Sequence, residues 1–253
     1  MSAALPSFRL DGRRVLVTGA GRGIGLAIAQ ACAASGAEVT LCARSAGEIG
    51  AATDALRALD LKAEALSADV TDVAGFAALI AARPAFDVFV NNAGTNRPKP
   101  LADVTVEDYD AVMGLNLRSA VFAAKAVTAG MIEEGRGGSV INMSSQMGHV
   151  GAANRTIYCA SKWGLEGFSK ALAVELAPHR IRVNTICPTF VETPMTEPYF
   201  RDTAFRSEVL SKIPLGRIGR VDEVAAAVVF LASDAASLMT GSALMLDGGW
   251  TAL

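Results

Sequence analysis

A short apolar run that passes through a glycine-rich turn into a helical pattern is the feature that most constrains the fold of this chain. Val15–Thr18 has the length of a buried parallel strand, and Gly19-x-x-x-Gly23-x-Gly25 then leads directly into Leu26–Gln30. Glycine permits a tight turn and lets backbone N–H groups approach a phosphate at a helix N-terminus. Glycine clusters alone mostly mark loops, but strand, turn and helix in this order favour dinucleotide binding.

Strands and helices alternate from Arg13 to Asp247, which predicts one α/β domain over residues 1–253. The other expected strands are Glu38–Ala43, Ala63–Ala68, Val88–Val90, Ser139–Met143, Ile181–Ile186 and Ala243–Leu246. The expected helices are Ala46–Leu59, one that begins near Asp72, Val106–Glu134, one from Tyr158 to a stop at Pro178, and Asp222–Ala232. The segment of about 189–220 contains three prolines and little strand pattern, so we expect it to form a lid.

Composition excludes several classes of partner. The net charge of −2 gives no field that would recruit nucleic acid or an anionic membrane. The longest apolar run, Ala225–Ala232, is too short to span a bilayer, and Met1–Leu10 has no apolar core of signal-peptide length. The four cysteines lie far apart without a Cys-x-x-Cys or Cys/His cluster. We therefore expect no metal, a reducing compartment and a cytoplasmic protein.

The end of the second strand favours NADP over NAD as the cofactor. In dinucleotide folds an acidic residue there binds the ribose hydroxyls, whereas an arginine accommodates a 2′-phosphate. This strand ends in Ala43, and Arg44 follows at once, while Arg22 in the glycine turn adds a second cation. Both arginines could instead be solvated surface charges, so NAD remains the alternative.

Polar residues follow the next strands at the same edge of the expected sheet. Asp69-Val70 ends the third strand, where the carboxylate could accept a hydrogen bond from an adenine amino group. Asn91-Asn92-Ala93-Gly94 ends the fourth and could brace the sheet and let a ribose pass close by. Asn116 interrupts an apolar helix pattern, which indicates a buried polar role because asparagine is a poor helix former.

Tyr158 and Lys162 are one helical turn apart and therefore share one helix face. A phenol normally loses its proton near pH ~10, and a fixed ammonium beside it would lower that pKa. The pair could thus act as an acid or base near neutral pH. By itself the pair could also be a chance meeting on a solvated helix.

Taken together, these motifs resemble the short-chain dehydrogenase/reductase family along almost the whole chain. The resemblance implies a Rossmann-type doubly wound parallel sheet of about seven strands with helices on both faces. It implies that Tyr158 transfers the proton, that Ser145 rather than Ser144 polarises the substrate oxygen, and that Lys162 holds the nicotinamide ribose and lowers the tyrosine pKa. Asn116 would keep a water in a proton relay. No metal is required.

The resemblance also extends the predicted binding sites. Pro188 and Thr193 stand where the family carries its proline and its nicotinamide-contacting threonine, but Thr189 replaces the usual glycine and could narrow the site. The complete predicted cofactor site is Gly19, Arg22, Gly23, Ile24, Gly25, Arg44, Asp69, Val70, Asn92, Ala93, Gly94, Tyr158, Lys162, Pro188, Val191 and Thr193. The predicted substrate residues are Ser145, Gln146, His149, Arg155, Tyr158 and Thr189.

The loop between Ser145 and Tyr158 is unusually polar, and this favours a polyol, sugar or sugar-acid substrate. Arg155 could bind a carboxylate bidentately at the mouth of the site, and Arg97 could add charge on the opposite wall. A 3-oxoacyl thioester is the alternative substrate, and a catalytically silent dinucleotide-binding regulator is the alternative of another class. The apolar helices and the family resemblance predict a homotetramer.

Overall fold

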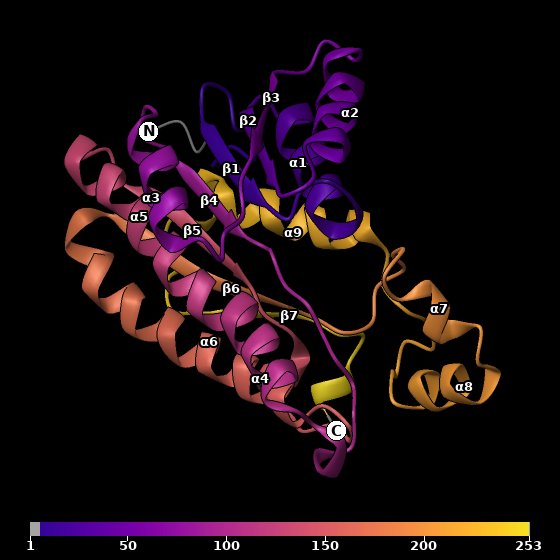
Figure 1. Cartoon of the computed structure of the whole chain (residues 1–253). Coiled ribbons are helices and arrows are strands. Elements are labelled where there is room, and N and C mark those ends of the chain that lie inside the picture. The colour runs from indigo at the N-terminus through magenta and orange to yellow at the C-terminus, as the bar shows by residue number, and fades with distance from the viewer. Residues whose placement is uncertain (1–5, 253) are drawn as a thin grey trace.

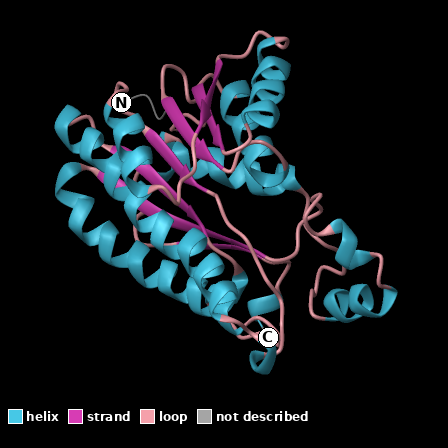
Figure 2. Cartoon of the chain, viewed as in Figure 1, coloured by secondary structure: helices cyan, strands magenta, loops and turns pink. Residues whose placement is uncertain are grey.

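The apolar run at the start of the chain forms β1 (Arg14–Thr18), a central strand of a parallel sheet with helices on both faces (Figures 1 and 2). The structure is a computed structural model that describes residues 6–252. The other strands are β2 (Glu38–Ala43), β3 (Ala63–Ser67), β4 (Val88–Asn91), β5 (Gly138–Met143), β6 (Ile181–Pro188) and β7 (Ala243–Leu246). In the described chain they pair in parallel in the order β3-β2-β1-β4-β5-β6-β7, which confirms the Rossmann-type prediction.

Strand residues alternate between two hydrophobic layers, because successive side chains of a strand point to opposite faces. Val15 and Val17 pack with α1 (Gly23–Ala34), α2 (Ala46–Arg57) and α9 (Val221–Ala232) on one face. Leu16 and Phe89 pack on the other face with α3 (Val73–Ala81), α5 (Ser119–Glu134) and α6 (Thr156–Leu176). Both faces of the sheet are therefore buried, as continuous apolar strand sequences require.

The long helix expected over Val106–Glu134 is interrupted by a π-helical segment. It consists of α4 (Val106–Met113), the π-helical turn Gly114–Arg118, and α5. Asn116 lies in this turn and is buried. A π-turn widens the helix locally and is common at functional sites, so the asparagine marks a break in helical register rather than a tolerated helix residue.

The segment after β6 folds beside the sheet as α7 (Glu197–Phe200) and α8 (Thr203–Ser211), which project from the body of the molecule in Figure 1. A small hydrophobic cluster of its own holds this segment together. Phe190 packs edge-on against Phe200 and Phe205 and at a tilt against Trp250, at centroid distances of 5.7–6.1 Å. Most of its apolar contacts are thus separate from the two layers that cover the sheet.

No helix within residues 6–252 has both the length and the hydrophobicity needed to cross a bilayer.

Candidate active site

The site is built where the strand order reverses, between β1 and β4, because helices that leave these strands cross in opposite directions and leave a crevice at their carboxyl ends. Asn92 joins the two strand ends: its Nδ2 donates to the backbone oxygens of Thr18 at 2.8 Å and Gly19 at 3.3 Å. The Thr18 hydroxyl accepts in return from the backbone N–H groups of Asn92 and Ala93. Asn92 therefore braces the sheet edge, as the sequence indicated.

The glycine turn needs glycine for two distinct reasons. Gly19 has a φ of +65°, a left-handed conformation that strains other residues. A Cβ on Gly25 would lie 2.2 Å from the backbone oxygen of Gly19, so any side chain there would push the turn and α1 apart. The turn thus brings the N-terminus of α1, where helix N–H groups lack partners within the helix, close to the end of β1.

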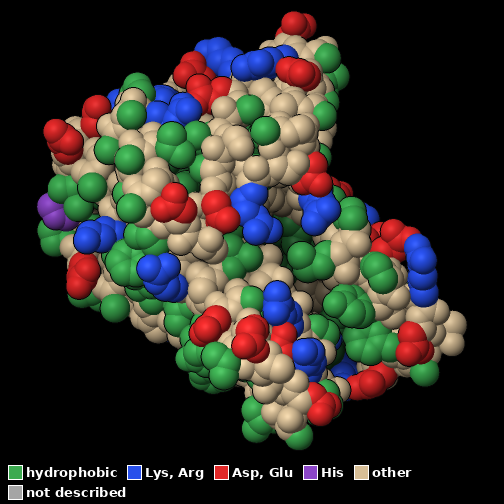
Figure 3. All heavy atoms as spheres, viewed as in Figure 1, with side chains coloured by type: hydrophobic (Ala, Val, Ile, Leu, Met, Phe, Trp, Pro, Cys, Tyr) green, Lys and Arg blue, Asp and Glu red, His purple; other side chains and the backbone are tan. Residues whose placement is uncertain are grey.

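A cleft of about 770 Å³ runs along the carboxyl ends of the strands. Figure 3 shows the molecular surface hollowed between the main body and the projecting α7–α8 segment, with Lys and Arg side chains nearby. Every residue of the predicted cofactor site lines this cleft, and so do Ser145, Gln146, Arg155 and Thr189 of the predicted substrate site. Asn116 and His149 do not line it.

The two predicted phosphate-binding arginines lie at the exposed end of the cleft. Arg44 Nη1 is 4.0 Å from Asp69 Oδ2, and Arg22 Nη1 is 3.6 Å from Glu48 Oε1. The other oxygen of Asp69 accepts from the backbone N–H and the hydroxyl of Thr71. The arginine side chains are about three-quarters exposed, so these ion pairs are weak and both guanidinium groups are available to an anion.

These features fit a dinucleotide with a phosphorylated ribose. A helix N-terminus behind a glycine turn provides backbone donors for a pyrophosphate, and the cleft is large enough for an extended ligand. Arg22 and Arg44 provide two exposed positive charges at the place where a 2′-phosphate is expected. When bound, the nicotinamide would supply or accept the hydride.

Ser145 is held in position by its neighbours at the other end of the cleft. Its hydroxyl donates to Gln146 Oε1 at 2.9 Å and accepts from the backbone N–H of Met147 at 3.1 Å. The neighbouring Ser144 hydroxyl is buried and lies beside the Cys187 thiol. The two candidate serines therefore differ in surroundings: Ser145 lies beside the phenol of Tyr158 and lowers its pKa, whereas Ser144 faces Cys187.

Tyr158 and Lys162 lie together, but the phenol pKa does not fall as the sequence suggested. The Lys162 ammonium is 5.6 Å from the centroid of the tyrosine ring and donates to the backbone oxygen of Met143 at 2.8 Å. Burial raises the pKa of Tyr158, and hydrogen bonding with Ser145 and the charge of Arg155 oppose it without overcoming it. Burial also lowers the pKa of Lys162 to about 8, against the opposing charges of Cys187 and Glu166. In the protein alone, desolvation therefore outweighs the attraction between ammonium and phenolate.

Asn116 lies behind the cleft rather than in its wall. Its Nδ2 donates to the backbone oxygen of Thr95 at 2.9 Å and to the hydroxyl of Ser161 at 3.2 Å, and its Oδ1 accepts from the Thr95 N–H at 2.8 Å. The π-turn thus connects the loop after β4 to α6, one residue before Lys162. Its proposed water-binding role remains a prediction.

Arg155 and Arg97 have different surroundings. Arg155 is half-buried in the cleft wall, and its Nη1 donates to the backbone oxygen of Asn154. Its Nε is buried and has no hydrogen-bond partner in the described part of the chain. Arg97 does not line the cleft, because Asp108 pairs with it at 3.1 Å and with Lys99 at 2.6 Å. The expectation that Arg97 charges the opposite wall is wrong.

Some cleft residues escaped the sequence analysis. Tyr199 and Met195 reach the cleft from the lid segment, and Glu48 reaches it from the first turn of α2. Tyr199 is near enough to Arg155 for their charges to interact. Nothing in the local sequence of the lid indicates which of its faces meets the sheet, so these residues could be found only from the fold.

The fold also joins residues that are distant in sequence. His149, Glu166 and Cys187 place an imidazole nitrogen, a carboxylate oxygen and a thiol within 4.8 Å of one another. The sequence showed no Cys/His cluster because the spacing carries no motif. His149, predicted to contact substrate, instead makes its side-chain contacts with Cys187 and Glu166.

Comparison with known proteins agrees with this geometry. A family model described as enoyl-(acyl carrier protein) reductase matches residues 19–251. The L-xylulose reductase of Bos taurus is 38% identical over 244 residues, which cover 96% of this chain and 98% of the relative. The gluconate 5-dehydrogenase of Gluconobacter oxydans strain 621H is 37% identical over 248 residues, with 96% of each chain covered.

A solved structure is similar along the whole chain. The gluconate 5-dehydrogenase from Burkholderia cenocepacia J2315, in complex with NADP and tartrate, has a TM-score of 0.93 and 35% identity. The similarity covers 97% of this chain and 98% of that chain.

The lowered pKa of Lys162 predicts a pH dependence of stability. A lysine whose pKa drops from 10.5 to about 8 on folding destabilises the native state fully below pH 8. The penalty shrinks as the pH rises above 8, because the native state loses the proton first, and disappears above 10.5. Relative to Lys162→Met, the wild-type free energy of unfolding should therefore rise by roughly 2–3 kcal/mol between pH 7 and pH 10. Urea unfolding of both proteins at the two pH values measures this change, and a pH-independent difference would contradict it.

Proposed function

Because the chain belongs to the short-chain dehydrogenase/reductase family, we propose that it transfers a hydride between NADP(H) and the secondary alcohol or ketone of a polyol, sugar or sugar acid. The observation that carries this proposal is the convergence of Ser145, Tyr158, Lys162 and Arg155 on the cleft that also contains the glycine turn. The named relatives act on sugars and sugar acids, which supports the same substrate class.

Tyr158 is the proposed proton-transfer group. Because burial raises its pKa, the phenol keeps its proton at neutral pH and suits donation to a carbonyl oxygen that gains negative charge. Ser145 would give up its hydrogen bond to Gln146 and donate to the same oxygen. Lys162, held by the carbonyl of Met143, would stabilise the phenolate that remains and bind the nicotinamide ribose. Asn116 would support a proton path to solvent behind Lys162.

Arg155 makes an acidic substrate the best fit within this class. A buried guanidinium N–H without a partner is costly and would be satisfied by an acceptor on the substrate. A carboxylate supplies two oxygens with the geometry of the arginine fork. The Burkholderia relative described with NADP and tartrate, a hydroxy dicarboxylate, supports this choice.

We also propose that the lid over about 189–220 closes on the substrate and that the chain forms a homotetramer. Pro194, Met195 and Tyr199 already line the cleft from the lid. The helices α4, α5 and α6 expose large apolar side chains, namely Tyr109, Phe122, Trp163 and Val174, that a second copy could cover. A single domain and a cytoplasmic location complete the proposal; four free cysteines fit a reducing compartment.

The cofactor preference is tested at Arg44. Arg44→Ala removes a charge-assisted contact to a 2′-phosphate, and such a contact contributes ~1.5–3 kcal/mol of binding free energy. This loss corresponds to roughly a 10- to 150-fold lower kcat/KM for NADPH. The value for NADH should change little. Arg57→Ala, an exposed arginine at the end of α2 outside the cleft, is the matched control and should change neither. Equal kcat/KM for the two cofactors in the unmutated enzyme would contradict the assignment.

The substrate class is tested with sugar acids, uncharged polyols and 3-oxoacyl thioesters as parallel substrates. We expect Arg155→Ala to lower kcat/KM for the preferred acid by roughly 10- to 150-fold and to leave an uncharged analogue nearly unchanged. Arg97→Ala is the control, because Asp108 already pairs with that arginine. An equal loss for acid and analogue would make Arg155 structural, and a preference for thioesters would overturn the substrate class.

A further inference from the structure

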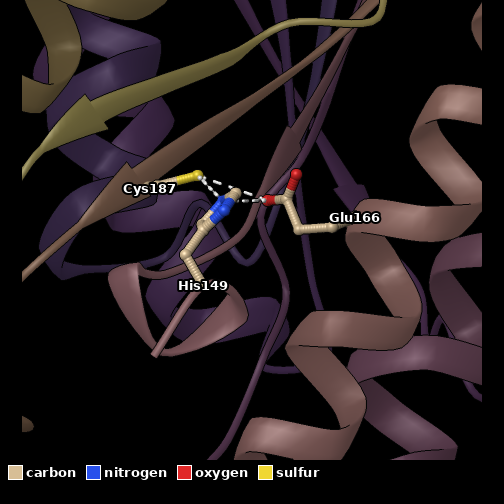
Figure 4. A group of neighbouring side chains, drawn as sticks. All are labelled: His149, Glu166 and Cys187. Atoms are coloured by element: carbon tan, nitrogen blue, oxygen red, sulfur yellow. Dashed lines mark hydrogen bonds and ion pairs between the residues drawn. The ribbon is translucent and has the colours of Figure 1, made fainter. Parts of the chain in front are cut away.

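Three buried or half-buried side chains of different chemistry meet behind the cleft, next to the elements that carry Ser145 and Lys162. His149 follows the short 3-10 turn Gln146–Gly148, Glu166 lies on α6 one turn after Lys162, and Cys187 is near the end of β6. Figure 4 shows the imidazole, the carboxylate and the thiol pointing toward one another from these three elements. We refer to His149, Glu166 and Cys187 as the triad.

The distances within the triad are close to those of a zinc site. Cys187 Sγ lies 3.2 Å from Glu166 Oε1 and 3.4 Å from His149 Nε2, and the nitrogen and the oxygen are 3.5 Å apart. Zinc bonds of about 2.3 Å to sulfur and 2.0–2.1 Å to nitrogen or oxygen, at tetrahedral angles, separate the ligand atoms by about 3.3–3.6 Å. Without an ion the same distances are bridged by hydrogen bonds, so the triad is already assembled.

The surroundings hold the ligand atoms in place. The Thr185 hydroxyl donates to Glu166 Oε2 at 3.0 Å, which leaves Oε1 directed at the other two groups. Such outer contacts orient carboxylate ligands in metal sites. The Ser144 hydroxyl is buried and lies beside the thiol, close enough to hydrogen-bond with it. This position suits either a fourth ligand of the ion or a hydrogen-bond partner of a water that serves as that ligand. His149 is 29% exposed and provides access from solvent, whereas Glu166 and Cys187 are buried.

We propose that His149 Nε2, Glu166 Oε1 and Cys187 Sγ bind one zinc ion, with a water or the Ser144 hydroxyl at the fourth position. The Cys187 thiol loses its proton to solvent as the Zn–S bond forms, and no electron is transferred. The two charges of the ion are then balanced by one thiolate and one carboxylate, so the buried site has no net charge. Sulfur, imidazole and carboxylate ligands together favour zinc over magnesium or calcium.

This site would connect zinc to catalysis. Glu166 lies one helical turn after Lys162 on α6, so a zinc ion bound to Glu166 would place positive charge close to the Lys162 ammonium. Cys187 precedes Pro188, whose carbonyl oxygen is 3.5 Å from Ser145 Oγ. Zinc would therefore act on both Lys162 and the wall that carries Ser145, and we expect it to lower kcat. The inference does not depend on which substrate the enzyme uses.

The test is a titration of the chelator-treated full-length protein with cobalt(II), followed by displacement with zinc. We expect one equivalent of cobalt to bind and to give a thiolate-to-cobalt charge-transfer band. Zinc should displace the cobalt and abolish the band, with a Kd for zinc of about 1 μM or tighter. Zinc binding should also raise the Tm of the protein. Cys187→Ser and His149→Asn should each abolish the band or weaken metal binding at least tenfold. Cys159→Ser and His179→Asn are the matched controls, since neither belongs to the triad.

Several outcomes would overturn the proposal. The unmutated protein could lack the band, the band could persist in Cys187→Ser, or it could be lost in Cys159→Ser. Circular dichroism and the metal-free Tm establish that each variant is folded. If Cys187→Ser does not fold, His149→Asn decides, because this side chain is partly exposed. In the activity assay, zinc should lower kcat in the wild type and in both control variants but not in His149→Asn.

Discussion

The amide side chains at the end of β4 hold together the elements on which the site depends. Asn92 ties the glycine turn to the fourth strand through the carbonyls of Thr18 and Gly19. Asn91 donates at 3.0 Å both to Asn142 on β5 and to the backbone oxygen of Ala120 on α5. Because these bonds join uncharged groups that are buried or partly buried, salt does not screen them. These bonds thereby connect the glycine turn to β4, and β4 to β5 and α5.

At the other end of the cleft, burial sets the protonation states of Tyr158 and Lys162. The helical spacing of Tyr158 and Lys162 indicated that they share a face, and they do. The spacing could not show how deeply the face is buried, and desolvation moves both pKa values toward the neutral forms. The protein alone thus keeps the phenol protonated and leaves the lysine close to titration at pH 8. A protonated phenol is the form that donates a proton to a carbonyl oxygen, and the phenolate left behind is the form that accepts one from an alcohol.

Strand positions were predictable from sequence because apolar runs and their glycine or asparagine ends are local signals. The π-turn around Asn116 was not predictable from sequence. The hydrophobic pattern continues through it, and a single polar residue at an apolar position is its only sign. Arg155 and Arg97 looked equivalent in sequence, and only the fold shows that Asp108 pairs with Arg97. The triad of His149, Glu166 and Cys187 depends on contacts between a turn, a helix and a strand, which spacing cannot reveal.

The most direct test of the account replaces Tyr158 with phenylalanine, which keeps the ring but removes the oxygen that transfers the proton. With NADPH and the best carbonyl substrate, kcat should fall by roughly 10²–10⁴, the range for loss of a general acid. Fluorescence titration should show that NADPH still binds with nearly the wild-type Kd. If Tyr158→Phe keeps a tenth or more of the wild-type kcat, Tyr158 is not the proton-transfer group and the proposed mechanism is wrong.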